Sequence, residues 1–148
     1  MASAFTKFQP FAAALANGHI NLSSDSVHVF LLNSNTGGPP SNAASFYSTL
    51  SANEINQAGC PGYTTGGANV TVTSSTQTSG LYTYIASCAN PTWTATGNWG
   101  NSFRYAIMYD GNSGFLIGYW DYGSILTLSS GNTFTIALDP VNGVFTLS

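Results

Sequence analysis

Few side chains in this sequence are suited to acid–base or nucleophilic chemistry. The candidates are the two histidines and the seven charged residues: His19, His28, Lys7, Arg104, Asp25, Glu54, Asp110, Asp121 and Asp139. His28 lies inside an apolar segment, 27–32, and neither histidine belongs to a recognised nucleophile motif. Because no acid, base and nucleophile can be grouped from so few residues, the sequence predicts no catalytic residues, no cofactor and no enzymatic activity.

One oppositely charged pair is expected to meet across two neighbouring strands. If residues 111–114 form a four-residue hairpin loop, the register places Arg104 directly opposite Asp121. Such a pair fixes the register of the hairpin if the neighbouring aromatic side chains enclose it, and this structural role is the prediction. The alternative is an arginine that recognises a ligand within an aromatic patch, because a guanidinium stacks on rings and clamps carboxylates.

The two cysteines, Cys60 and Cys88, leave two interpretations open. They are too few for a disulfide scaffold, and two thiols without a nearby pair of histidines cannot build a tetrahedral metal site. They are either two small apolar core residues or a single disulfide bridge formed outside a reducing cytosol. No metal site is predicted.

Aromatic side chains supply the candidate binding surface. The sequence holds 20 of them, and both cores and interfaces use such residues for their large area. Trp99 lies in a Gly-Asn-Trp-Gly loop, which predicts either an exposed anchor for a partner or a sugar, or a cap on the core. Phe5, Phe8 and Phe11 are expected to be exposed apolar positions that dock on a partner.

Length and charge narrow the classes of function. The chain has 148 residues, which suits one domain, and 5% of them are charged, against about 25% in an average soluble domain. Two basic residues cannot neutralise a run of phosphates or anionic lipids, so neither nucleic acid nor a membrane is an expected partner. The sequence also shows no membrane-spanning stretch and no signal-peptide pattern. A surface with so little charge favours association, so we expect the chain inside an assembly.

The pattern along the chain predicts an all-β fold with one short N-terminal helix. The three N-terminal phenylalanines recur at the spacing of a helical face. Because of Pro10, the helix either starts near Gln9 or is kinked there, and Asn17–Gly18 ends it. A second short helix is expected at 51–56, where Ser51 and Glu54 have capping-box spacing. Strands are expected at 27–32, 69–75, 81–88, 92–95, 103–109, 115–122, 133–138 and 144–147.

About eight short strands joined by Gly- and Asn-rich turns favour an antiparallel β-sandwich or a jelly-roll-like fold. We expect one domain over residues 1–148. Within it, residues 1–25 form an N-terminal helix or arm and residues 26–148 form the β-sandwich body.

Several segments, in their order along the chain, resemble one family of small tailed-phage proteins. They are KFQPF (7–11), LSSDSVHVFLL (22–32), GYTTGG (62–67) and PTWTA (91–95), and more strongly FRYAIMY (103–109), LIGYWDYGS (116–124), GNTFTI (131–136) and NGVFTL (142–147). The resemblance covers nearly the whole chain, although the family pattern includes neither cysteine. It implies a structural protein of the virion and supplies no catalytic residues.

Small all-β proteins of tailed-phage heads often act as decoration or cement proteins. We therefore expect a homodimer or homotrimer that binds the major capsid protein on the exterior of the head, after synthesis in the host cytoplasm. The alternative is a carbohydrate- or receptor-binding β module of a tail or fibre, in which Trp99 and the aromatic patch at 119–122 form a stacking platform.

Overall fold

The computed structural model describes residues 4–33, 38–70, 72–78, 80–86, 90–139 and 143–147, and for 72–78 and 81–86 it describes the backbone alone. The strands are β1 (Phe5–Lys7), β2 (Val27–Asn33), β3 (Ala68–Val70), β4 (Val72–Thr78), β5 (Leu81–Ala86), β6 (Thr92–Thr94), β7 (Phe103–Asp110), β8 (Leu116–Leu126), β9 (Thr133–Thr135) and β10 (Phe145–Leu147). The helices are α1 (Phe11–Ala16), α2 (Tyr47–Leu50) and the 3-10 helix η2 (Ser51–Asn53). All eight predicted strand segments contain a strand.

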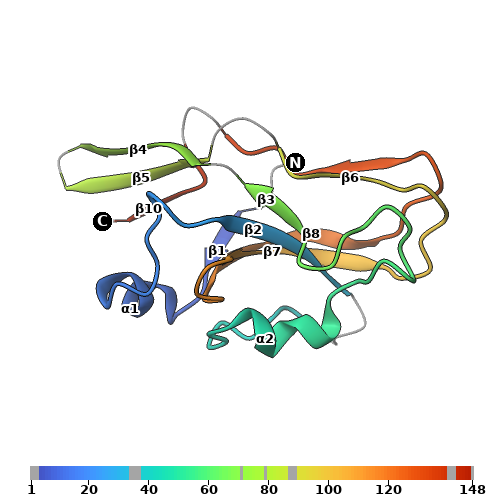
Figure 1. The fold of residues 1–148 in the computed structure, drawn as a ribbon, viewed down its shortest axis with the longest axis horizontal. Helices are drawn as coiled ribbons and strands as arrows, with labels where there is room; N and C mark the ends of the chain where they lie inside the picture. The colour runs from blue at the N-terminus through green and yellow to red at the C-terminus, as the bar shows by residue number, and fades with distance from the viewer. Residues whose placement is uncertain are drawn as a thin grey trace.

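The strands form three antiparallel sheets in a sandwich-like arrangement, which confirms the predicted all-β class. The largest sheet has the order β1-β8-β7-β2-β3, and the smaller ones have the orders β10-β5-β4 and β6-β9. In Figure 1 the two smaller sheets lie on one side of the five-stranded sheet, and α1 and α2 lie on the other.

Both faces of the five-stranded sheet are buried. On β2, Val29 and Leu31 belong to the core cluster shared with the small sheets, whereas Phe30 and Leu32 belong to the cluster on the opposite face. All four side chains are 0–1% exposed, and each contributes about 1.5–3 kcal/mol of burial free energy. A strand covered on both faces needs apolar residues at every position, which explains the unbroken apolar run at 27–32.

The N-terminal segment starts as a strand, so Phe5 does not belong to the predicted helical face, although the helix begins close to Gln9, as Pro10 predicts. Residues Phe5–Lys7 form β1 and pair with β8, with Phe5 opposite Trp120. The helix α1 begins only after Pro10, whose fixed φ of −70° suits a helix start. Gly18, at φ +72°, follows the helix end at Asn17, as predicted. The described part of residues 1–25 is thus joined to the sheet through β1.

The second helical segment lies earlier than predicted, and the expected capping box is wrong. Helix α2 and η2 span residues 47–53, and neither has a side-chain cap. Glu54 instead turns inward at 7% exposure, where its carboxylate accepts hydrogen bonds from Tyr63 Oη (2.6 Å), Tyr47 Oη (2.6 Å) and the Gly66 N–H (2.7 Å). Three charge-assisted hydrogen bonds outweigh the single bond of a cap. No helix in the described ranges is long and apolar enough to cross a membrane.

Candidate functional site: an aromatic groove

Three of the four aromatic residues expected to be exposed lie in the core. Phe8, Phe11 and Trp99 are 2%, 1% and 6% exposed, so the prediction that they dock on a partner is wrong. Trp99 instead caps the core, the other role that the sequence left open, and its Nε1–H donates to the Pro61 carbonyl at 2.9 Å. Phe5 is half-buried, with its ring centroid 4.7 Å from that of Trp120.

The predicted pair of Arg104 and Asp121 forms, but through a different register. The guanidinium binds the carboxylate with two hydrogen bonds, Nε to Oδ1 at 2.7 Å and Nη2 to Oδ2 at 2.9 Å. The residue directly opposite Asp121 is Tyr105, because an irregularity between Met108 and Tyr109 shifts the β7–β8 register. The geometry is the planar two-point clamp typical of arginine and a carboxylate.

A second irregularity makes β8 bulge outward beside this pair. One residue, Arg104, faces the four residues 122–125 of β8, which we call the β8 bulge. Gly123 sits there at φ +87°, and its N–H donates to Asp121 Oδ1 at 2.8 Å. Asp121 therefore joins the bulge to β7, and its hydrogen bonds with Arg104 are the main cause that holds its pKa below the usual range. The Arg104–Asp121 pair thus holds the β8 bulge against β7.

The bulge carries two of the large apolar side chains that the described chain exposes to solvent. Tyr122 is 53% exposed and Ile125 is 62% exposed. The ring of Tyr122 also packs edge-on against Phe134 of β9, with 6.0 Å between centroids. The exposed apolar surface of the bulge is thus held in place by contacts on two sides.

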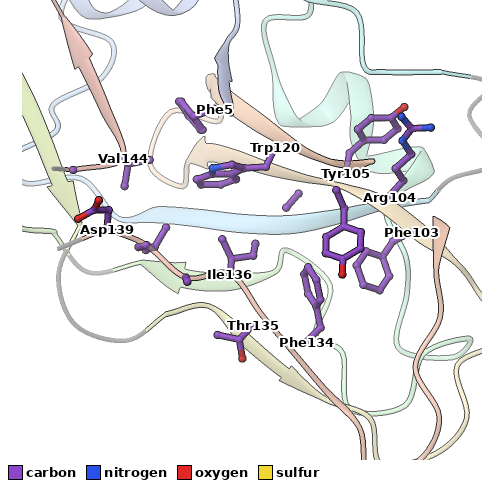
Figure 2. A pocket seen from close by; sticks show the side chains of 15 residues that line it. Phe5, Phe103, Arg104, Tyr105, Trp120, Phe134, Thr135, Ile136, Asp139 and Val144 are labelled. Atoms are coloured by element: carbon purple, nitrogen blue, oxygen red, sulfur yellow. The ribbon is translucent and has the colours of Figure 1, made fainter. Parts of the chain in front are cut away.

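Next to the bulge lies a groove of about 430 Å³, which we call the aromatic groove. Its floor is the β7–β8 face, and its opposite wall is β9 with the segment that follows it, as Figure 2 shows. The rings of Phe103 and Phe134 pack edge to face there, with 4.8 Å between their centroids. The apolar and aromatic side chains that line the groove include Phe5, Phe103, Ala106, Trp120, Tyr122, Phe134, Ile136, Ala137, Leu138 and Val144.

Polar groups make up the smaller part of the groove lining, and the side chains that carry them are Arg104, Tyr105, Trp120, Tyr122, Thr135 and Asp139. Trp120 is half-buried, and its Nε1–H donates to no other group among the described residues. Asp139 stands at one end of the lining, and Figure 2 shows the Arg104 side chain turned away from Ile136 and Phe134. A small number of polar groups in an aromatic concavity is the usual make-up of a binding pocket. The arrangement suits the burial of an apolar or aromatic guest that brings one hydrogen-bond acceptor.

The other ionisable side chains serve the fold. Asp110 is 0% exposed and accepts hydrogen bonds from the backbone N–H groups of Asn112 and Ser113, both at 3.1 Å, which holds the β7–β8 turn. His28 lies in β2, where burial lowers its pKa. Within the described residues, no three His, Cys, Asp or Glu side chains are grouped to hold a metal ion.

Cys60 is a free thiol with 0% exposure, and burial raises its pKa. Its Sγ lies 3.8 Å from the Asn101 carbonyl oxygen. Cys88, the other half of the disulfide alternative, lies outside the described residues. The structure thus places Cys60 among the core residues, as one of the two interpretations expects.

The sequence offered little to reveal the groove. The residues of its floor belong to β7 and β8, and those of its wall are 134–139 and 143–144. Phe5, which also lines the groove, comes from the N-terminal end of the chain. The one usable signal was the aromatic run at 119–122, which contains Trp120 and Tyr122. Alternation along a strand separates these two from Tyr119 and Asp121, which face the opposite side.

Comparison with known proteins adds no relative. No protein-family model matches this chain, and no curated protein and no solved structure does either.

Proposed function

We propose that this chain is a non-enzymatic structural protein of a tailed-phage particle, a decoration protein that binds the major capsid protein and stabilises the head. The sequence resemblance and the scarcity of charge support the particle as its location. The structural observation that carries the proposal is the exposed apolar β8 bulge beside the aromatic groove, with Tyr122 at 53% and Ile125 at 62% exposure.

The mechanism is burial of this surface against the capsid. A large apolar side chain that becomes fully buried contributes about 1.5–3 kcal/mol, and the groove accepts an apolar side chain of the partner in return. No charged residue needs to be desolvated on the bulge, because 122–125 reads Tyr-Gly-Ser-Ile. Modest contacts of this kind, repeated over many copies on a lattice, resist expansion of the shell.

The experiment is a binding assay with capsids that lack the protein. The purified chain is mixed with such capsids and pelleted, and release of DNA is followed during heating. We expect saturable binding and a higher temperature of DNA release. Ile125→Ser and Tyr122→Ser should each weaken binding by about tenfold, equivalent to 1.4 kcal/mol.

The matched control is Phe46→Ser. Phe46 is also a large exposed apolar residue, at 41%, but it packs against Phe115, away from the groove residues. This variant should bind like the wild type, with thermal unfolding used to confirm that all variants fold. Absence of binding by the wild type, or equal loss in all three variants, contradicts the proposal.

A second candidate function is a carbohydrate-binding module of a tail or fibre. The observation that favours it is the pair of aromatic rings at the groove, Trp120 and Tyr122, since aromatic faces stack on sugar rings. Trp99, expected to serve here, is buried and excluded from this role. Titration with host-surface glycans tests it: binding that Trp120→Ala abolishes supports a sugar site, and no binding to any glycan removes it.

A further inference from the structure

Strand β4 lies at the edge of the three-stranded sheet. The order of that sheet is β10-β5-β4, and among the described residues β4 pairs with β5 alone. In Figure 1, β4 is at the margin of the molecule, on the side of β5 away from β10. One edge of β4 therefore presents backbone N–H and C=O groups that no described strand pairs.

This edge lacks the charged side chains and prolines that usually prevent an exposed strand from pairing, and the irregularity in its pairing with β5, between Val72 and Ser74, lies at the start of the strand. Proteins blunt such edges with charged side chains, prolines or very short strands. Strand β4 has seven residues, Val-Thr-Ser-Ser-Thr-Gln-Thr, without proline and without charge. No charged residue occurs anywhere between Glu54 and Arg104, so neighbouring segments supply no repulsion either.

We infer that β4 is a self-association strand, which pairs antiparallel with β4 of a second copy of this chain. Full overlap of 72–78 with its own copy places Ser75 on the twofold axis and Ser74 opposite Thr76 of the second copy. Identical strands can align in this way because no like charges meet across the seam. The two three-stranded sheets then become one continuous sheet of six strands.

This interface is separate from the aromatic groove. It is the contact through which copies of the proposed decoration protein would associate with one another. The inferred β4 pairing does not depend on the capsid being the partner of the aromatic groove. Strand pairing alone covers less than the roughly 1,200 Å² of a typical stable interface, so the dimer should depend on concentration. On a lattice, the effective concentration of neighbouring copies reaches about the millimolar range, and at that concentration even a weak contact forms.

Disulfide trapping tests the register. In a Cys88→Ser background, Ser75→Cys should form a covalent dimer on mild oxidation, because residues facing each other across the axis lie about 4.5–5.5 Å apart between Cα atoms. Gln77→Cys is the matched control. In the same register its two copies are about 14 Å apart along the strands, too far for a disulfide. Cross-linking of both variants to the same extent, or of neither, overturns the inference.

Sedimentation velocity over a concentration series tests the association itself. The wild type should shift from monomer towards dimer as its concentration rises. Ser75→Lys places two ammonium groups at the axis and should abolish the shift, whereas Ala52→Lys, on the exposed surface of η2, should keep it. A wild type that stays monomeric throughout, or a dimer that Ser75→Lys leaves intact, contradicts the β4 interface. Capsid binding is measured separately, so failure here is distinguishable from failure of the proposed function.

Discussion

Tyr63→Phe should destabilise the protein through a hydrogen-bond network that only the fold creates. The Tyr63 hydroxyl is buried, donates to Glu54 Oε1 at 2.6 Å and accepts from the Leu31 N–H at 3.1 Å. The variant leaves the Leu31 N–H unpaired inside the core and removes a donor from a buried carboxylate. An orphaned buried donor costs about 1–3 kcal/mol, and a hydrogen bond to a charged group contributes about 1.5–3 kcal/mol.

The expected loss is about 3 kcal/mol in the free energy of unfolding, after allowance for the overlap of these two contributions. At about 3 °C per kcal/mol for a chain of this length, Tm should fall by about 9 °C. The assay is urea unfolding at pH 7. The control is Tyr122→Phe, whose ring is half exposed and whose stability should stay within about 0.5 kcal/mol of the wild type.

The same residue should control stability at alkaline pH. Burial, followed by the charge and hydrogen bond of Glu54, raises the pKa of Tyr63 far above its ordinary value. Below pH 10 the tyrosine is protonated in both states; above pH 10 it ionises only in the unfolded chain, so stability falls as pH rises. Its contribution to the slope is about 1.4 kcal/mol per pH unit. Tyr63→Phe should therefore show a shallower loss between pH 10 and 12. Equal stability at pH 7 and an unchanged slope would refute the reasoning.

Three further changes have distinct expected outcomes. Gly67→Ala should cost at least about 2 kcal/mol, because at φ +78° a Cβ would clash with the Val29 carbonyl oxygen of β2. Gly18→Ala, at φ +72° in open space, should cost about 1 kcal/mol in the same unfolding assay. Arg104→Gln should raise the pKa of Asp121 towards its ordinary value, as an NMR titration of the carboxyl group would show; an unchanged pKa would mean that the pair does not persist in solution. Trp99→Phe should lower Tm through loss of its hydrogen bond but leave capsid affinity unchanged, and a large loss of affinity in the folded variant would restore Trp99 as an interface residue.

Much of the fold was accessible from sequence because its strands carry strong local signals. The apolar runs at β2, β7 and β8, the last two joined by a turn that has Gly114 at positive φ, were enough to predict these strands and the all-β class. β1 was missed because the spacing of Phe5, Phe8 and Phe11 also fits a helix. Pairing with β8, a contact between distant parts of the chain, decided between the two.

The site depends more heavily on tertiary structure. The Arg104–Asp121 contact was predictable from charge, but the irregularities in β7–β8 that create the bulge have no clear sequence signal. Glu54 fits a capping motif, and only the folded arrangement brings Tyr63 and Tyr47 to its carboxylate. Exposure was the least predictable property, because it depends on which aromatic residues the distant segments cover.

The most direct test of the proposed function is an electron cryomicroscopy reconstruction of capsids saturated with this protein. The account predicts density for the chain on the outside of the head, with Tyr122 and Ile125 and the aromatic groove against the major capsid protein. A decorated capsid in which these residues face solvent, or a capsid that carries no density for the chain at saturating concentration, would contradict it.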